Sequence, residues 1–366
     1  MSPSGTLPTP RSVDLELTSR CNARCSYCYY LGNEGVGYDD MPTESWIALF
    51  EEMSRASVLR VCLGGGEALT RSDFFELVDG VVCNRMRFQL LTNGRLVTPE
   101  VARRLQATSR CESVQVSIDG SCPEVHESMR GAGSFAPAIA ALNMLRAAGL
   151  QVTVRVTVHA GNVEDLPALA KLLLVDLGVP DFSTNAVSSL GTAEKYQGLM
   201  LNARQRLRAM EVLVALAAEY PGRISGTAGP LAEARMYAQM RAAAASGRPI
   251  AGHGRLVACG CVFERLAVRA DGAYVPCVML PLQVIGHAGQ MPLVDAWQSQ
   301  IMARMRARGQ TALTEFAECA GCRYVESCTG NCPGSSSSLT GDPHQPSPES
   351  CLRRFEEALA AEGVEW

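Results

Sequence analysis

The chain lacks any long apolar run. Its first twenty residues contain no apolar stretch that could form the core of a secretory signal peptide. No uninterrupted apolar segment elsewhere approaches the roughly 20 residues that span a bilayer. The net charge is also small. A formal value of −4 gives no basis for a nucleic-acid partner or a polybasic membrane patch. We therefore expect a cytoplasmic protein that binds neither nucleic acid nor membrane.

The remaining composition is that of an ordinary globular protein. Of the 366 residues, 47% are apolar and 19% are charged, which is enough for a sizeable core. The length allows one large domain with a smaller one, or two medium domains.

Cysteine is the exception, with 15 residues. In a reducing cytosol, such density indicates metal ligation or redox chemistry more than structural disulfides. Three cysteines fall within residues 21–28 and eight within 259–351. The other four are expected to be small buried apolar residues: Cys62, Cys83, Cys111 and Cys122.

From Val13 to about Tyr220, short apolar runs alternate with amphipathic ones such as 42–56 and 134–149, the second opening at Ser134 and stopping at Gly149. This alternation predicts an α/β fold with parallel strands. Six units are too few for the usual eight-unit barrel, and periodicity leaves open whether the sheet is open or a partial barrel. The expected strands are 13–18, 58–63, 86–92, 113–119, 152–158 and 182–187.

After Tyr220 the pattern changes. An Ala-rich helix and a connector occupy 226–258, and from Cys259 on, short irregular segments carry closely spaced cysteines. We expect metal ligation to hold this part folded more than packing does. The stretches 335–338 and 344–348 are expected to be loops. The predicted divisions are a tail (1–12), the α/β core (13–225), the connector (226–258), the cysteine-rich domain (259–351) and a C-terminal helix (352–366).

The first expected strand ends in LTSRCNARCSYCYY, which spaces Cys21, Cys25 and Cys28 as C-x3-C-x2-C. Three thiolates on one loop can hold three corners of a 4Fe–4S cube. The alternative is a zinc site, which needs a fourth ligand. The motif resembles the radical S-adenosylmethionine (radical SAM) signature, and the resemblance extends through the N-terminal unit. It implies a partial (β/α)6 barrel. It also implies that S-adenosylmethionine binds the open iron and is cleaved reductively to a 5′-deoxyadenosyl radical that abstracts hydrogen.

Further motifs of that family follow at strand ends. The second strand runs into a Gly-Gly-Glu turn, the third ends in TNG, and the fourth reads VSIDG with HESMRG after it. Glycines allow close backbone approach to the methionine part, a carboxylate can accept from its ammonium group, and an Arg fork suits its carboxylate. The resemblance implies these contacts to S-adenosylmethionine: Tyr27, Gly65, Gly66, Glu67, Thr92, Asn93, Ser117, Asp119, Arg130, Arg155, Asn162 and Val187.

The later cysteines resemble the SPASM domain, an auxiliary-cluster module of many peptide-modifying radical enzymes. Twelve residues separate Cys259 from Gly272, four more precede Cys277, and a C-x2-C-x5-C-x3-C run follows. The resemblance implies two further 4Fe–4S clusters. The outer one would be held by Cys319, Cys322, Cys328 and Cys351, and the inner one by Cys259, Cys261, Cys277 and Cys332.

One feature departs from that family. Relatives with a fully ligated inner cluster separate their first two cysteines more widely than the Cys259-Gly260-Cys261 of this chain. Full ligation is favoured, but an open inner iron available to a substrate thiolate stays a possibility, as does a pair of zinc knuckles.

The resemblance is nearest to maturases of ribosomally made peptides, of the SynChlorMet-cassette or tyramine-excising type. Cys277 is followed by Val-Met-Leu and not by Asp, which argues against a sulfatase-maturing enzyme. Only twenty residues precede Cys21, so a precursor peptide is expected to need a separate leader-binding protein or a direct surface. The expected reductant is a flavodoxin or a ferredoxin-type protein. The alternatives are an enzyme acting on a small molecule and a non-catalytic electron carrier.

Overall fold

The computed structural model describes residues 6–30 and 39–366, so part of the predicted tail, residues 1–5, lies outside the described residues. A ten-stranded sheet runs through the described chain in the order β10-β9-β8-β1-β2-β3-β4-β5-β6-β7. Its strands are β1 (Ser12–Thr18), β2 (Arg60–Gly65), β3 (Arg87–Thr92), β4 (Cys111–Ser117), β5 (Val152–Val158), β6 (Phe182–Ala186), β7 (Ile224–Gly226), β8 (Arg265–Val268), β9 (Ala273–Val275) and β10 (Gly286–His287).

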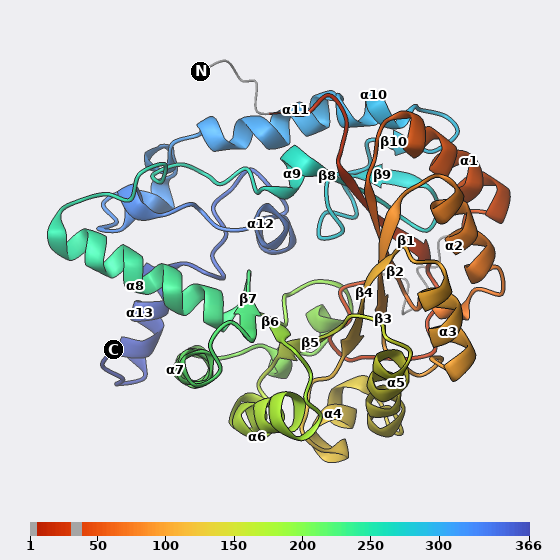
Figure 1. The fold of residues 1–366 in the computed structure, drawn as a ribbon. Helices are drawn as coiled ribbons and strands as arrows, with labels where there is room; N and C mark the ends of the chain where they lie inside the picture. The colour runs from red at the N-terminus through yellow and green to blue at the C-terminus, as the bar shows by residue number, and fades with distance from the viewer. Residues whose placement is uncertain (1–5, 31–38) are drawn as a thin grey trace.

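The six expected strands are present as β1–β6, all parallel. A short seventh strand, β7, adds parallel to β6 and was not predicted. Val13, Leu15 and Leu17 alternate along β1 and are buried against the helices, because successive strand side chains point to opposite faces. The expected α/β fold is confirmed, and Figure 1 shows helices α1–α6 around the outer side of a curved, open sheet, which is the partial-barrel alternative.

The helices follow the amphipathic runs, and both helices expected in the core are found. Ser134 is the N-cap of α5, although its hydroxyl donates to the Gly131 carbonyl at 2.6 Å and accepts no N–H of the helix. Gly149, two residues beyond α5, has φ +82°, where a side chain would be strained. The helices are α1 (Thr43–Arg55), α2 (Phe74–Cys83), α3 (Pro99–Ala107), α4 (Pro123–Arg130), α5 (Phe135–Ala147), α6 (Leu166–Lys171), α7 (Ala203–Glu219), α8 (Pro230–Ser246), α9 (Cys261–Glu264), α10 (Leu293–Trp297), α11 (Gln300–Ala307), α12 (Pro333–Thr340) and α13 (Leu352–Ala361).

The start of the cysteine-rich part belongs to the same sheet. β8 pairs parallel with β1, placing Leu266 opposite Val13, and β9 pairs antiparallel with β8. Leu266, Val268 and Tyr274 are fully buried in the main core. Ladder hydrogen bonds and apolar burial therefore help to hold residues 259–277, and the expectation that metal ligation orders this segment more than packing does stays a prediction.

A second, smaller core holds the end of the chain. Tyr237 of α8, Tyr324, and Leu352 and Phe355 of α13 are buried together. α13 packs on α7, and in Figure 1 both lie with α8 on the side of the molecule away from α1–α3. The predicted C-terminal helix thus packs beside the segment that carries Cys322 and Cys328, which touch this core.

One of the two expected loops is a helix. The serine run 335–338 lies inside α12 and is not a loop. Pro333 occupies the first turn, Gly341 ends the helix at φ +80°, and Ser336 Oγ donates to the Asp342 and Gln345 carbonyls at 2.9 and 2.7 Å. These contacts outside the helix offset the weak helix propensity of serine. The stretch 344–348 is irregular, as expected.

The four scattered cysteines are not buried. Cys83 is exposed at the end of α2, and Cys62, Cys111 and Cys122 are partly exposed. Strand alternation explains Cys62, whose neighbours Val61 and Leu63 take the buried helix-facing side. None of the helices in the described ranges is long and apolar enough to cross a membrane.

Candidate functional site

Three thiols gather on the loop that leaves β1. Cys25 and Cys21 both lie near enough to Cys28 to act on it electrostatically, and burial raises the pKa of Cys28 to about 12. Burial also raises the pKa values of Cys21 and Cys25. The loop alone therefore does not stabilise thiolates, whereas bound iron would, because a coordinating thiol is deprotonated. Half-buried thiols converging from one loop fit three corners of a 4Fe–4S cube.

The loop is braced from two directions. Ser26 donates its N–H to the Met129 carbonyl at 2.9 Å. On the other side, Thr192 Oγ1 donates to the carbonyls of Cys25 and Cys28 at 3.1 and 3.2 Å. A Cβ at Gly191 would lie 2.3 Å from the Cys28 carbonyl oxygen, so that position requires glycine. No motif in the sequence marks this brace at residues 191–192.

The Gly-Gly-Glu turn packs on the same loop. Gly66 and Glu67 donate their N–H groups to the Thr18 and Arg20 carbonyls at 2.8 and 2.9 Å. A Cβ at Gly65 would lie 2.6 Å from the Thr18 oxygen, and one at Gly66 would lie 2.2 Å from the Arg20 oxygen. The close approach that requires these glycines in this structure is therefore to the protein's own backbone.

Glu67 is buried, 1% exposed, and its carboxylate accepts hydrogen bonds from the turn after β3. Thr92 Oγ1 donates to Oε1 at 2.9 Å, and the Asn93 N–H donates to Oε2 at 2.8 Å. Burial raises the pKa of Glu67 to about 7 despite these bonds. The structure thus brings Glu67, Thr92 and Asn93 together, and lone pairs of the carboxylate remain for a cation.

The predicted residues Tyr27, Asp119 and Arg130 form a second buried group around the Asp119 carboxylate. The Asp119 carboxylate accepts from the Tyr27 hydroxyl, from Arg130 Nε, and from the Thr157 N–H at 2.7 Å. Burial raises the pKa of Asp119, but Arg130 and these donors outweigh burial and lower it overall. Asp119 thereby connects the cluster loop to the ends of α4 and β5, and it accepts from Arg130 through Nε.

The remaining predicted residues lie on or after β4, β5 and β6. Arg155 Nε donates to Gln115 Oε1 at 3.3 Å, and Ser117 ends β4 opposite Arg155. Val187 follows β6 and donates its N–H to the Val158 carbonyl at 3.0 Å. Asn162 is fully buried and donates to the Asp119 and Thr157 carbonyls, so its side chain is structural.

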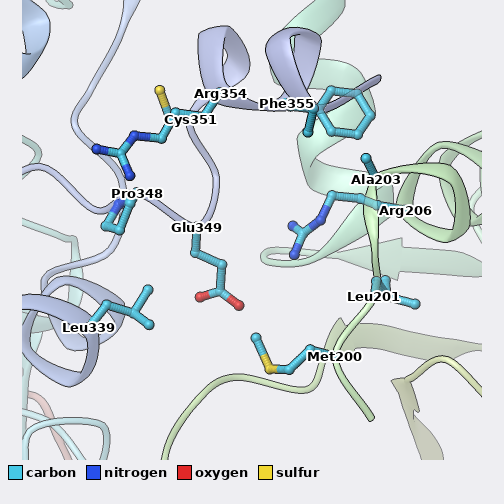
Figure 2. A pocket seen from close by; sticks show the side chains of 11 residues that line it. Met200, Leu201, Ala203, Arg206, Leu339, Pro348, Glu349, Cys351, Arg354 and Phe355 are labelled. Atoms are coloured by element: carbon cyan, nitrogen blue, oxygen red, sulfur yellow. The ribbon is translucent and has the colours of Figure 1, made fainter. Parts of the chain in front are cut away.

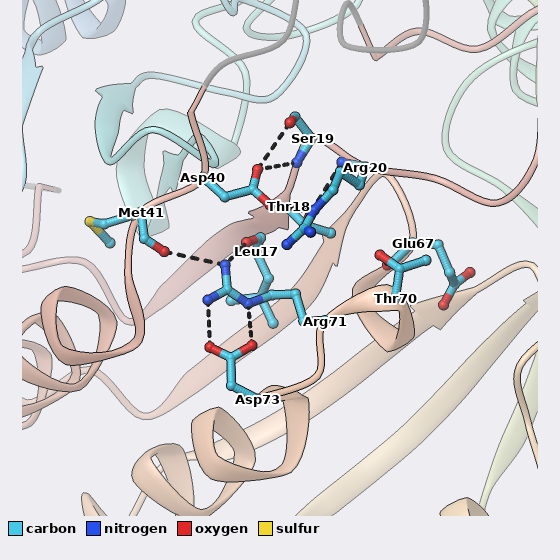
Figure 3. Close-up of polar contacts among 10 residues, drawn as sticks. All are labelled: Leu17, Thr18, Ser19, Arg20, Asp40, Met41, Glu67, Thr70, Arg71 and Asp73. Atoms are coloured by element: carbon cyan, nitrogen blue, oxygen red, sulfur yellow. Dashed lines mark hydrogen bonds and ion pairs between the residues drawn. The ribbon is translucent and has the colours of Figure 1, made fainter.

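Two further side chains support the start of the loop and carry no motif. Asp40 accepts from Thr18 Oγ1 and from the Ser19 N–H, the latter at 2.7 Å. Arg71 donates to the Leu17 carbonyl at 2.9 Å and the Met41 carbonyl at 3.2 Å and pairs with Asp73, as Figure 3 shows. Their partners at the start of the loop, Leu17, Thr18 and Ser19, lie 21 to 54 residues away along the chain, so only the tertiary structure reveals these contacts.

The predicted outer set converges in the C-terminal part. Burial raises the pKa of Cys319 to about 11, and Cys328, Cys351 and Cys322 all lie close enough to raise it further. Burial also raises the pKa of Cys328, and Cys351 and Cys322 lie close enough to raise it further. Four thiols within mutual electrostatic reach fit the corners of one cluster.

Three of the four predicted inner thiols lie together. Cys259 Sγ lies 2.6 Å from Cys261 Sγ, longer than a disulfide, and Cys261 also contacts Cys277. A Cβ at Gly334 would meet both Met279 and Cys332 Sγ, which places Cys332 beside the turn after Cys277. In the described ranges no three His, Cys, Asp or Glu side chains gather tightly enough for a single metal ion. Cys261 therefore lies with Cys259 and Cys277, and Cys332 lies on the neighbouring turn.

A cavity of 320 Å³ borders the outer set between α7, α12 and α13. Figure 2 shows the Glu349 carboxylate and the Arg206 guanidinium pointing into it, with Met200 at its wall. Cys351 is part of its lining. Burial raises the pKa of Glu349, while Ser335 and Arg206 partly offset this effect. The cavity belongs to the C-terminal side and takes no lining from the three-cysteine loop.

Comparison with known proteins agrees with both cysteine groups. A model of the radical SAM superfamily matches residues 15–173, and a model of the iron–sulfur cluster-binding SPASM domain matches residues 259–329. The mycofactocin maturase MftC of Mycobacterium tuberculosis (strain ATCC 25618 / H37Rv) is 30% identical over 97% of this chain and 86% of its own length. The chain belongs to the radical SAM superfamily. The predicted SPASM domain is confirmed with it.

Two other similarities are more limited in extent or in identity. The mycofactocin maturase MftC of Mycobacterium ulcerans (strain Agy99) is 41% identical, but the match covers only 45% of each chain. Streptococcus suis SuiB, solved with its precursor peptide SuiA, superposes with a TM-score of 0.72 at 15% identity, covering 94% of this chain and 76% of that one. The similarity to SuiB is one of fold alone. As a radical SAM enzyme with a SPASM domain, the chain uses S-adenosylmethionine and iron–sulfur clusters, as predicted.

Proposed function

We propose that this enzyme is a peptide maturase that holds three 4Fe–4S clusters and abstracts hydrogen from a residue of a ribosomally made peptide. The observation that carries the proposal is the grouping of the clustered thiols. Three converge on the loop after β1, four gather around Cys319, and Cys259 and Cys277 contact Cys261, with Cys332 on the turn that packs against Met279. A three-thiol set leaves one iron for a small molecule, whereas the four-thiol sets are suited to electron transfer.

The residues of the barrel have distinct roles in this proposal. When bound, the three-thiolate cluster supplies the electron that cleaves S-adenosylmethionine. Glu67, Thr92 and Asn93 position the loop on the Cys21 side and accept from the ammonium group. Arg130, fixed by Asp119, offers its remaining nitrogens to the carboxylate. Ser117 ends β4 and Val187 directly follows β6, at the carboxyl ends where ligands of parallel sheets bind, and Arg155 lies midway along β5 opposite Ser117.

In the C-terminal part we propose Cys261 as the fourth ligand of the inner cluster. Its sulfur contacts Cys259 and Cys277, so the short C-G-C spacing does not prevent both thiols from reaching one site. Cys259 has φ +60°, a conformation that costs backbone energy in a non-glycine residue. Ligation of both cysteines would offset that cost.

A peptide substrate is supported by the relatives named as maturases and by SuiB, whose structure holds a precursor peptide. We propose further that the enzyme acts in the cytoplasm, that a flavodoxin or ferredoxin-type protein reduces it, and that a leader peptide is presented by a separate leader-binding protein or by direct contact.

The test is a mass-spectrometric assay of the anaerobic holoenzyme with S-adenosylmethionine, dithionite and any short peptide encoded beside its gene. We expect a mass change confined to one peptide residue, with one 5′-deoxyadenosine formed per modification. An unmodified peptide, with 5′-deoxyadenosine rising instead in response to a small molecule, would favour the small-molecule alternative. No 5′-deoxyadenosine under any condition would favour a carrier of electrons.

A further inference from the structure

Arg308, just after α11, is a buried cation surrounded by carbonyl groups. It is 1% exposed. Its Nε donates to the Pro343 carbonyl at 2.7 Å and its NH2 to the Gln345 carbonyl at 2.9 Å. Its NH1 donates to the carbonyls of Val257 and Asn331, the latter at 3.3 Å. None of these partners carries charge, and a buried charge without a counter-charge is costly.

No carboxylate among the described residues pairs with Arg308. Asp342 lies within electrostatic reach, but its oxygens accept from the His344 N–H at 2.8 Å and Gln345 Nε2 at 3.3 Å. Burial lowers the pKa of Arg308 to about 10. Three nearby groups favour its charged form and partly offset burial, in the order Cys332, Cys259 and Asp342. The two foremost groups are thiols of the proposed inner cluster.

The backbone contacts of Arg308 place it between the two turns that carry these thiols. Val257 lies two residues before Cys259, and Asn331 directly precedes Cys332. Both Cys259 and Asn331 have positive φ, at 60° and 63°. One side chain therefore ties together the two strained turns of the inner set and brings a positive charge to them.

We propose that Arg308 is the counter-charge of the inner cluster and raises its reduction potential. The inference rests on the proposed cluster at Cys259, Cys261, Cys277 and Cys332. Four thiolates give such a site net negative charge, and each added electron increases it. A fixed cation in a poorly screened interior therefore stabilises the reduced state more than the oxidised state. Arg308 acts through the cluster's charge and is a positioning residue, not a catalytic one.

The test is a potentiometric titration, read by electron paramagnetic resonance, of reconstituted enzyme in a Cys21/Cys25/Cys28→Ala background that keeps only the SPASM clusters. At the potential where one cluster of the parent is half reduced, Arg308→Gln should raise its oxidised-to-reduced ratio at least tenfold, about 59 mV for one electron. Arg308→Lys, which keeps the charge, should stay within about threefold of the parent.

Arg306→Gln is the matched control. Arg306 also donates to backbone carbonyls, those of Val262 and Trp297, both at 2.9 Å, but burial is the sole influence on its pKa. Its loss should leave both potentials unchanged.

The remaining outcomes either overturn the proposal or support it. Equal potentials for Arg308→Gln, Arg308→Lys and the parent overturn it, and so does loss of about four irons from both Arg308 variants alike, which would make Arg308 a structural brace. Loss of the cluster from Arg308→Gln alone, with a parent-like potential in Arg308→Lys, supports it. If the background protein itself holds only about four irons, the proposed inner cluster fails, a result that the iron assay separates from the potential.

Discussion

The Asn93 N–H donates a 2.8 Å hydrogen bond to Glu67 Oε2, and the Asn93 side chain reaches the cluster loop. Asn93 Nδ2 lies 2.8 Å from Asn22 Oδ1 and 3.9 Å from Cys21 Sγ. The buried carboxylate is therefore connected to the first cysteine through one intervening residue. Glu67 orients the loop in addition to any contact with S-adenosylmethionine.

This relationship predicts the effect of Glu67→Gln. The amide would present an N–H₂ group toward one of the donors Thr92 and Asn93, and it would remove the charge available to an ammonium group. We expect S-adenosylmethionine affinity to fall about tenfold or more, as for a lost charged hydrogen bond of about 1.5–3 kcal/mol. Equilibrium dialysis measures this, with Glu76→Gln on the exposed face of α2 as the control. An unchanged affinity would remove Glu67 from the site.

The three-thiol loop is tested by metal content. The parent enzyme, reconstituted anaerobically, should hold about 12 irons, and the Cys21/Cys25/Cys28→Ala variant should lose about four and form no 5′-deoxyadenosine. Cys83→Ala, which removes an exposed cysteine outside the three sets, should change neither quantity. About four irons in the parent, or zinc in place of iron, contradicts the three-cluster proposal.

The inner set is tested by comparing Cys259→Ala and Cys261→Ala. Because Cys261 contacts both neighbouring thiols, we expect each variant to lose the inner cluster's iron and sulfide to the same extent. The pairing of β8 with β1 should keep the fold itself intact in both. A loss confined to Cys259→Ala would instead indicate three cysteine ligands and an open iron.

Glu16 on β1 predicts a pH dependence of stability. It is 3% exposed, and burial raises its pKa from 4.5 to about 8, which Arg269 only partly offsets. The folded chain keeps a proton that the unfolded chain has released, so this group's contribution is full below about pH 4.5 and is lost as pH rises toward 8. Glu16→Gln should therefore gain stability over the parent by about 2 kcal/mol between pH 6 and pH 8.

Urea unfolding of the holoenzyme under anaerobic conditions measures this difference. Glu51→Gln, at an exposed position of α1, should show the same pH profile as the parent. If the free energies of unfolding of Glu16→Gln and the parent differ by the same amount at pH 6 and pH 8, Glu16 is ionised in the folded enzyme.

The sequence by itself determined the chemistry and most of the core. Spacing within one loop brings Cys21, Cys25 and Cys28 together whatever the rest of the chain does, because a loop of eight residues has little reach. Apolar periodicity located β1–β6, since parallel strands buried on one face require it. Glycine at 65 and 66 could likewise be singled out, because glycine marks close approach.

Tertiary structure alone decided what those residues contact. It assigned the glycines to the chain's own backbone, Arg130 to Asp119, and Cys62 to the face of β2 away from the helices. It also joined β8 and β9 to the core sheet and placed Arg308 between Cys259 and Cys332. These outcomes depend on pairings between segments far apart in sequence, which local propensity and periodicity do not encode, because the energy that selects them arises only on packing.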